Sequence, residues 1–288
     1  MTHPDNVFSN DFLLRKSSSA LAAQSVSVCE LISSFANRTS LGFCAKGEEL
    51  MPMALTQTAP VRNQILTGLP REKYASLFSN LRPVTLSAHE VLYSAEDQIR
   101  FTYFINSGMA SFMSISTEGN SIEVGNVGNE GMVGIPVLLR HVKSPHQVLV
   151  QVPGDALVIS ADILTKEFEK EGELKNRLLR YTHALATYTS QLGVCNHFHT
   201  VDKRLCRWLL ISSLQVQSRI FNLTHESLSQ VLGTGRTGVT MAANKLQRAG
   251  VIEYHRGQIT ILDYAGMENI CCDCYRITKD LFEDSLTS

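Results

Sequence analysis

The chain has 288 residues, 44% of them hydrophobic and 18% charged, with a net charge of −1, which is typical of a globular protein of about two domains and argues against a disordered or fibrous one. No run of about 18 apolar residues is present, and the N-terminus lacks a basic start followed by an apolar stretch, so the sequence predicts neither a membrane span nor a secretory signal. Seven cysteines without framework spacing are typical of reduced thiols, and we expect the protein in the cytoplasm.

Residues 1–60 are dominated by Ser, Ala, Thr and Asn and show no sustained hydrophobic period. Such a segment predicts a disordered extension. An alternative is that translation begins at Met51 or Met53, just before the patterned region.

Residues 61–172 are predicted to form a domain rich in strands. Residues 63–81 indicate a short helix pair, with Pro70 placed to begin the second helix. Strand-like runs follow at 83–93, 101–116, 121–127, 146–154 and 155–164, separated by Gly, Asn, Ser and Asp. Many short strands bounded by turns predict an N-terminal antiparallel β-roll, and the whole chain is therefore predicted to be α+β.

Residues 173–200 predict one long helix. Apolar side chains recur along it with the a/d spacing of a heptad repeat, namely Leu178, Tyr181, Leu185, Tyr188, Leu192 and Cys195. This pattern is typical of a two-stranded coiled coil, so we predict a dimerisation helix and a homodimer. The alternative is that the same stripe packs on its own domain.

Residues 201–268 predict a winged helix-turn-helix. After an amphipathic helix that begins at Val201, Thr224 is a good N-cap for a short helix, which Gly233 ends because glycine adopts the left-handed conformation without strain. A second helix begins near Arg236, and a hairpin about residues 255–257 follows as a wing. Two short helices around a glycine are the motif that places its second helix in the major groove of DNA.

The outer face of that second helix carries most of the candidate DNA contacts. The residues predicted to contact DNA are Thr224, Arg236, Thr237, Thr240, Met241, Asn244, Lys245 and Arg256. Arginine and asparagine can bond to guanine and adenine edges, while Thr224, Lys245 and Arg256 suit phosphates. Residues 201–262 contain eight Lys and Arg and three acids, a local net charge of +5, which favours phosphate binding. We therefore predict a homodimer that binds double-stranded DNA at a palindromic operator.

Residues 269–288 form a tail that holds Cys271, Cys272 and Cys274. Together with Cys195 and His199, which lie four residues apart on one helical face, these thiols leave open an alternative function, that of a redox- or metal-responsive regulator. The favoured interpretation places Cys195 in the dimer seam and assigns no metal and no cofactor. Within the tail, Arg276 is the candidate for stabilising a thiolate.

Sequence motifs of catalysis are missing from the chain. It contains no phosphate-binding glycine loop, no nucleophile elbow and no HExxH run. We therefore expect that the protein is not an enzyme.

Three segments of the chain resemble the Crp/Fnr family of bacterial transcription regulators. They are GNEGMVGIPVLL at 128–139, VDKRLCRWLL at 201–210 and LTHESLSQVLGTGRTGVTMAANKLQRAGVIEYHRGQITILD at 223–263. The resemblance covers residues 63–268. It implies a cyclic-nucleotide-binding-like sensor roll, a long dimer helix and a DNA-binding domain, with RNA polymerase as a further partner.

The resemblance fails at the positions that bind cyclic nucleotides in the family. A Gly-Glu pair and an Arg-Ser pair bind the ribose and the cyclic phosphate there, and the matching pairs here are Gly134-Ile135 and Ser144-Pro145. Isoleucine accepts no hydrogen bond and no arginine anchors the phosphate, so we do not expect cyclic AMP to bind. The nearby cations Arg140, His141 and Lys143 leave open a different anion. We predict a degenerate sensor that responds to an unidentified signal.

Two further departures concern other parts of the family pattern. Members that sense oxygen hold an iron–sulfur cluster through closely spaced N-terminal cysteines, whereas the N-terminal extension here has only Cys29 and Cys44, so we expect no such cluster. Many members begin the recognition helix with Arg-Glu and carry a second arginine later. This chain keeps the first as Arg236 but has Thr237 and Met241 at the other two positions, which predicts a different operator sequence.

Overall fold

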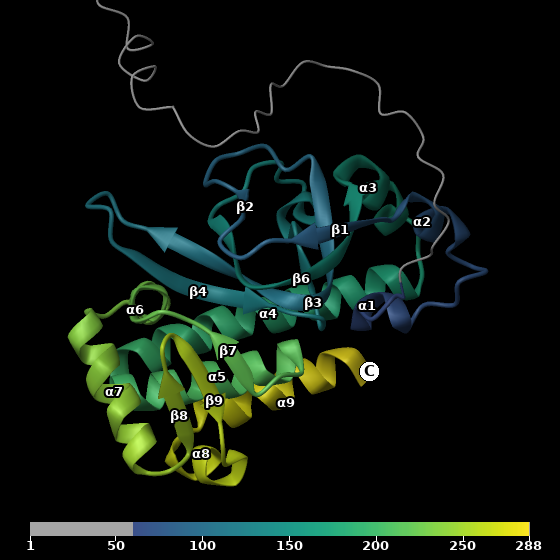
Figure 1. The fold of residues 1–288 in the computed structure, drawn as a ribbon. Coiled ribbons are helices and arrows are strands. Elements are labelled where there is room, and N and C mark those ends of the chain that lie inside the picture. The colour runs from purple at the N-terminus through teal and green to yellow at the C-terminus, as the bar shows by residue number, and fades with distance from the viewer. Residues whose placement is uncertain (1–59, 288) are drawn as a thin grey trace, which may run out of the picture. The chain divides into compact units, whose positions relative to one another are not determined.

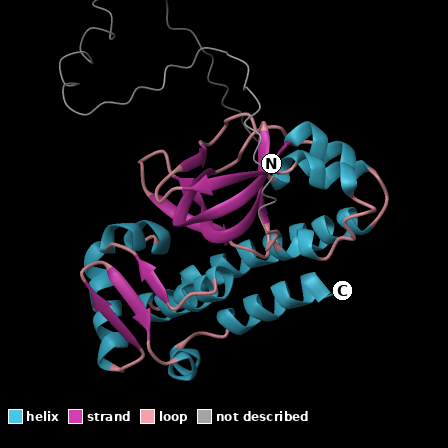
Figure 2. Cartoon of the chain, turned by 45° about the vertical axis from the view of Figure 1, so that its right-hand side comes forward, coloured by secondary structure: helices cyan, strands magenta, loops and turns pink. Residues whose placement is uncertain are grey.

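The computed structural model describes residues 60–287, and the predicted disordered extension over residues 1–60 therefore lies almost entirely outside the described residues. The described part folds as a β-roll, a long helix, a winged helix-turn-helix and a C-terminal helix (Figures 1 and 2). The predicted α+β class is confirmed.

The roll is built from six antiparallel strands. They are β1 Arg82–Leu86, β2 Val91–Tyr93, β3 Phe101–Ile115, β4 Ser121–Val127, β5 Met132–Val133 and β6 Gln147–Ser160. The strand order is β1-β6-β3-β4, with β2 paired to β6 and β5 paired to β3. The long central pair β3 and β6 is bent by register shifts between Ile105 and Ala110, which curve the sheet into a roll.

Two sequence predictions within the roll are wrong. The chain does not break at Gly154, because this residue pairs with Leu86 inside one continuous strand β6, and a Cβ there would collide with the backbone of Ser107. The run 155–164 is not all strand, since α3 Ala161–Glu169 begins immediately after Ser160. The alternating pattern in the first half of this run caused the predicted strand to extend beyond Ser160, where β6 ends.

Short helices close the ends of the roll. α1 Gln64–Thr67 is capped by Asn63, whose side chain accepts a hydrogen bond from the backbone of Leu66. α2 Ala75–Asn80 begins five residues after Pro70, so the predicted helix pair is present but its second member starts later than predicted. A 3-10 helix, η1 Ile135–Leu139, follows Gly134, which has a φ of 108°.

The long helix α4 Glu173–Phe198 covers the roll, and its buried stripe faces its own chain. Leu178, Tyr181, Tyr188 and Leu192 belong to the core of the roll, with exposures of 0 to 3%. The hydroxyl of Tyr181 donates to the Met132 carbonyl at 3.3 Å, and that of Tyr188 donates to Asn126 at 3.1 Å. The prediction that these residues form the dimer seam is therefore corrected for this conformation.

The two remaining residues of the predicted seam differ from each other. Cys195 is fully buried against Cys272 and Cys274, whereas Leu185 is only half-buried. The physical reason for the correction is that two neighbouring stripes of α4 share the heptad period. The stripe one residue later, at Leu179, Ala186 and Gly193, is rotated by about 100° from the first and is exposed, although Ala186 also borders the cavity between the helix and the roll.

The DNA-binding domain has the predicted elements and two that were not predicted, a short first strand and a helix after the wing. Its helices are α5 Val201–Val216, α6 His225–Leu232, α7 Arg236–Arg248 and α8 Tyr264–Ile270, and its strands are β7 Ile220–Asn222, β8 Ile252–His255 and β9 Gln258–Ile261. The strands form one sheet in the order β7-β9-β8. The sequence analysis did not predict β7, whose three residues are too few to show an alternating pattern.

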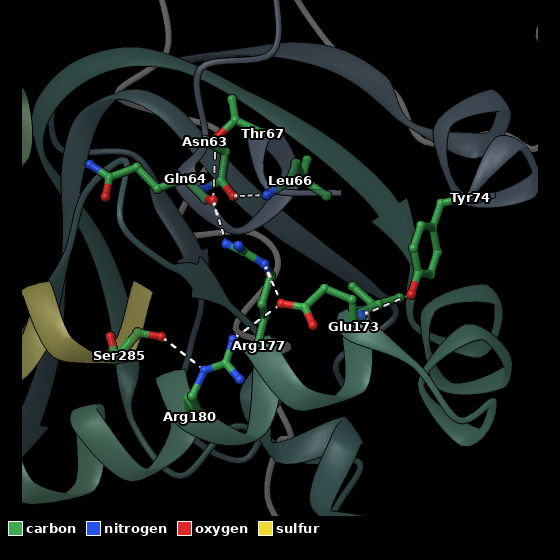
Figure 3. A network of polar contacts seen from close by, with 10 residues as sticks. Asn63, Gln64, Leu66, Thr67, Tyr74, Glu173, Arg177, Arg180 and Ser285 are labelled. Atoms are coloured by element: carbon green, nitrogen blue, oxygen red, sulfur yellow. Dashed lines mark hydrogen bonds and ion pairs between the residues drawn. The ribbon is translucent and has the colours of Figure 1, made fainter. Parts of the chain in front are cut away.

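The tail after the motif forms the helix α9 Cys274–Thr287, which lies antiparallel to α4 (Figure 1). Phe282 packs edge-on against Tyr188, with ring centroids 5.5 Å apart. The far end of α9 is held by a polar network at the start of α4, where Arg180 donates to the Ser285 carbonyl at 3.2 Å and to Glu173, also at 3.2 Å (Figure 3). The tail is thus an integral part of the packed structure.

Candidate DNA-reading surface and sensor cavity

The recognition helix α7 has one face in the domain core and the other in solvent. Val239, Ala243 and Leu246 are buried, as the sequence predicts. Five of the predicted DNA contacts on this helix are exposed, namely Arg236, Thr237, Met241, Asn244 and Lys245. This surface can therefore approach base edges without rearrangement of the core beneath it.

The helix before it is oriented by its caps. Thr224 is the N-cap of α6, and its hydroxyl accepts a hydrogen bond from the Ser227 amide at 3.1 Å. Gly233 ends the helix in the left-handed conformation, with φ of 56° and ψ of 47°. Both predictions are confirmed, and together they fix the turn that aims α7.

Two of the predicted DNA contacts form ion pairs with carboxylates of the same chain. Arg236 forms an ion pair with Glu226, and both side chains are about half exposed or more, so DNA phosphates can compete for this arginine. Lys245 Nζ lies 2.5 Å from Asp202 Oδ2, which is mostly buried. Burial raises the pKa of Asp202, but hydrogen bonds, that from Lys245 foremost, lower it by more, so the pKa lies below its ordinary value and the carboxylate is ionised at neutral pH. Lys245 therefore joins α7 to α5 in this state.

Thr240 is half-buried, in contrast to its neighbours on the helix. Its hydroxyl donates to the Arg236 carbonyl at 2.9 Å and lies 3.1 Å from His225 Nδ1. The ring of His225 stacks on Tyr254 of the wing, with centroids 4.7 Å apart. Thr240 therefore links α6, α7 and the wing, a positioning role that the sequence did not indicate.

The wing is a hairpin with a two-residue turn. His255 pairs with Gln258, and the turn residues Arg256 and Gly257 have φ of 49° and 80°. Positive φ at both positions is the type I′ geometry that matches the twist of paired strands. The turn presents the exposed Arg256 at its tip, where the sequence predicts it.

The roll and the long helix enclose a cavity of roughly 360 Å³. Ile135 and Pro145 both line it, so the two positions that depart from the cyclic-nucleotide pattern share one cavity. Its other walls are mainly apolar, with Phe112, Leu139 and Val148 among them. Such a cavity suits a ligand with more apolar surface than charge.

The polar groups of this cavity are few and already engaged. Thr182 and Thr189 donate to carbonyls of their own helix, at 2.7 and 2.9 Å, and Ser144 donates to the His146 carbonyl at 2.7 Å. Burial lowers the pKa of His146, so this ring supplies no positive charge at neutral pH.

The basic residues near the cavity are directed elsewhere. Arg140 pairs with Glu169 at 3.8 Å and Lys143 with Glu96 at 3.3 Å, and both of these cations are more than half exposed. Neither side chain lines the cavity. The suggestion that these cations provide an anion site inside the roll is therefore not supported.

Buried polar groups join the roll to the DNA-binding domain. Glu123 of β4, 3% exposed, accepts hydrogen bonds from Trp208 Nε1 at 3.0 and 3.1 Å and from Ser111 at 2.5 Å. Glu130 accepts one from Gln215 at 2.9 Å. Desolvation raises the pKa of each carboxyl to about 7, although these hydrogen bonds partly oppose the rise. Trp208 and Gln215 both lie on α5, so these hydrogen bonds join the roll to the first helix of the DNA-binding domain.

The cysteines of the tail lie beside buried arginines that the sequence analysis missed. Arg276, the candidate it named, is exposed and pairs with Asp273 at 3.8 Å. Arg207 of α5 is instead 3% exposed and interacts electrostatically with Cys195. The helical spacing of α5 could have indicated Arg207 only if it had been known that α9 packs nearby.

Comparisons with known families agree with the order of these domains. Residues 83–171 match the family described as cyclic nucleotide-binding domain, and residues 203–270 match the Crp-like helix-turn-helix domain. No curated protein sequence matches the chain closely enough to count as a relative. Among residues 60–287, no helix is both long and apolar enough to cross a membrane.

Solved structures share the fold at low identity. A transcriptional regulator assigned to the crp/fnr family from Eubacterium rectale is 20% identical, with a TM-score of 0.53 over 72% of this chain and 96% of that one. FixK2 from Bradyrhizobium japonicum is 12% identical, with a TM-score of 0.54 over 67% and 98%. TTHB099, a regulator of the CRP family from Thermus thermophilus, is 16% identical, with a TM-score of 0.53 over 65% and 95%.

Proposed function

The chain belongs to the Crp/Fnr family of transcription regulators, and we propose that it acts as a homodimer that reads a palindromic operator with one recognition helix per half-site. The observation that carries the proposal is the exposed polar face of α7 above a buried core, on a chain with a single such motif among its described residues. One helix covers only a few base pairs, so tight specific binding requires two copies related by a two-fold axis.

The roles of the DNA contacts are proposed from their exposure and their partners. Arg236 and Asn244 read bases, because both are exposed on α7 and their side chains can bond bidentately. Thr224 at the start of α6 and Arg256 at the wing tip contact phosphates. Thr237 and Met241 set apolar contacts on the same helix, while Thr240 positions α6 against α7.

The dimer interface is proposed on the exposed stripe of α4. Leu179, Ala186 and Gly193 recur every seven residues on this face, and Leu179 is 46% exposed although apolar. Small side chains at the last two positions allow close approach of a second helix, and the heptad period is that of a two-stranded coiled coil. The occupant is a second copy of this chain, because the operator geometry requires one.

Sedimentation of charged variants tests this interface. Leu179→Asp combined with Gly193→Asp should give monomers that lose tight operator binding but keep their fold, since both positions are exposed and a Cβ at Gly193 would meet no described atom within 4 Å. Val142→Asp is the matched control, because Val142 is 58% exposed in a loop of the roll. A double variant that stayed dimeric with unchanged affinity would place the interface elsewhere.

The DNA-binding proposal itself is tested by selection from a random pool of duplexes. Wild-type protein should enrich a motif with two inverted half-sites. Enrichment of a single half-site would contradict the homodimer, and no enrichment at all would contradict sequence-specific binding.

Further parts of the proposal rest on the family alone. RNA polymerase is a proposed partner at the promoter, the cytoplasm is the proposed compartment, and no catalytic step is assigned to the chain. The roll is proposed to sense a small ligand with mainly apolar surface instead of cyclic AMP, because Ile135 and Ser144 line the cavity at the positions that the resemblance matches to a carboxylate and an arginine.

A further inference from the structure

Four side chains with metal-binding atoms meet where α9 begins beside the end of α4. They are Cys195 and His199 from α4 and its C-cap, and Cys272 and Cys274 from the start of the tail. Cys195 and Cys272 are 77 residues apart in the sequence, yet their sulfurs lie 3.7 Å apart. All four ligand atoms lie within 4.8 Å of one another. None of these contacts is explained by DNA binding or by the roll cavity.

We propose that Cys195, His199, Cys272 and Cys274 bind one Zn²⁺ ion per chain. Tetrahedral zinc has Zn–S bonds of about 2.3 Å and Zn–N bonds of about 2.0–2.1 Å, which correspond to ligand separations of about 3.8 Å between two sulfurs and about 3.6 Å between sulfur and nitrogen. The Cys195–Cys272 pair at 3.7 Å and the Cys274 Sγ–His199 Nδ1 pair at 3.5 Å match these edges. Three thiolates and one imidazole are a complete structural zinc set.

Contacts within the protein hold the proposed ligands in place. Cys195 and His199 are four residues apart at the end of a helix, and the His199 amide donates to the Cys195 carbonyl at 3.1 Å. Gln191 Nε2, one turn earlier, lies 3.1 Å from Cys274 Sγ and can donate to it. The three cysteines are 0, 6 and 2% exposed, so the site is closed to solvent on the sulfur side. Closed, fully ligated sites of this kind are structural and not catalytic.

Charge in the surroundings favours a bound thiolate set. Arg207, 3% exposed, interacts with Cys195, and its Nε and Nη1 atoms have no hydrogen-bond partner among the described residues. Arg204 Nε, also facing this region, is likewise unpartnered. A buried guanidinium without sufficient negative charge is costly. Zinc with three thiolates and a neutral imidazole carries a charge of −1, which would add to the interaction that Arg207 already has with Glu123.

The separations disfavour an iron–sulfur cluster at the same residues. A cluster holds its cysteine ligands on different irons, which are spread apart by bridging sulfides. Sulfurs at 3.7 Å fit a single ion. The ion would fasten the start of α9 to the end of α4, immediately before α5 begins at Val201, so it stabilises the joint that orients the DNA-binding domain.

Metal analysis of purified full-length protein tests the proposal. Wild type should contain one zinc per chain, whereas Cys274→Ser and Cys195→Ser should each retain less than a tenth of it. Cys271→Ser is the matched control and should keep the full content, because Cys271 is adjacent in sequence but outside the four-ligand group. X-ray absorption at the zinc edge of wild type should show three sulfur and one nitrogen neighbours, which decides the matter even where a variant fails to fold.

Trypsin cleavage tests the proposed zinc site without depending on DNA binding. Trypsin cleavage after Arg276 and Lys279 should become at least tenfold faster when a chelator removes the ion, because α9 loses its fastening to α4. The proposal is overturned by wild type with no zinc, by iron with inorganic sulfide at these residues, by a Cys195–Cys272 disulfide in the native protein, or by Cys271→Ser losing zinc as Cys274→Ser does.

Discussion

The recognition helix presents polar side chains to solvent, whereas the cavity of the roll is walled mainly by apolar ones. On α7 the exposed residues include Arg236 and Asn244, which can bond to base edges. Ile135 and Ser144, which the resemblance matches to the carboxylate and the arginine of the cyclic-nucleotide pattern, both line the cavity. The difference teaches that one end of the molecule is suited to a charged polymer and the other to a ligand of low charge.

Breaking the joint between the two regions should have the largest effect. Trp208→Ala removes a fully buried ring and leaves Glu123 without two of its hydrogen bonds, and we expect a loss of about 3–5 kcal/mol in the free energy of unfolding. Trp208→Phe keeps a smaller buried aromatic ring but removes the donor, and should cost about 1–3 kcal/mol. Urea unfolding measures both. Equal losses would mean that the lost hydrogen bonds to Glu123 account for the whole effect and that burial of the ring contributes little.

Arg236→Ala tests whether the recognition helix α7 reads bases. We expect a loss of about 1–3 kcal/mol in operator binding and relaxed preference at one operator position, because a bidentate contact to a base is removed. The measurement is selection from a random duplex pool followed by affinity titration.

Arg256→Ala is the matched control for base reading. Removal of this side chain should weaken binding to all DNA sequences about equally. It should also reduce the slope of log affinity against log salt concentration by about one per wing engaged. If this variant changed the selected motif while Arg236→Ala left it intact, the wing would read the bases and the helix would anchor the protein.

The pH dependence of stability tests the buried carboxyls at the joint. The folded pKa of Glu123 and of Glu130 is raised to about 7, above the ordinary value for the unfolded chain, so the folded form binds the proton more tightly. The stabilisation is complete below the unfolded pKa and is lost as pH rises through 7. We therefore expect the free energy of unfolding to fall by roughly 1 kcal/mol per group between pH 6 and pH 8.

Glu123→Gln is the control for this titration, because the neutral amide cannot lose a proton. It should flatten part of the decline between pH 6 and pH 8 in urea unfolding. A variant whose stability declined as steeply as that of wild type would assign the titration to other groups.

The smallest expected effect is that of cyclic AMP. Calorimetric titration at millimolar nucleotide should give no saturable heat, since no Lys or Arg among the described residues lines the cavity to hold the phosphate. Micromolar binding would contradict this and would remove the contrast between the two regions.

Much of the fold could be predicted because its signals are local. The capping by Thr224, the left-handed turn at Gly233 and the buried period of Val239, Ala243 and Leu246 each depend on residues a few positions apart. The same holds for the alternation of the strands and for the exposed face of α7. Short-range physics therefore determined the elements and their order.

Tertiary structure alone decided which face of a helix meets which neighbour. The pairs Leu178-Leu179, Leu185-Ala186 and Leu192-Gly193 give α4 two stripes of equal period, and only packing against the roll and α9 selects the first for burial. Likewise Cys195 and His199 became part of a four-ligand group only because α9 folds back on α4. Contacts between residues distant in the sequence follow from the summed burial of whole surfaces, which no local pattern encodes.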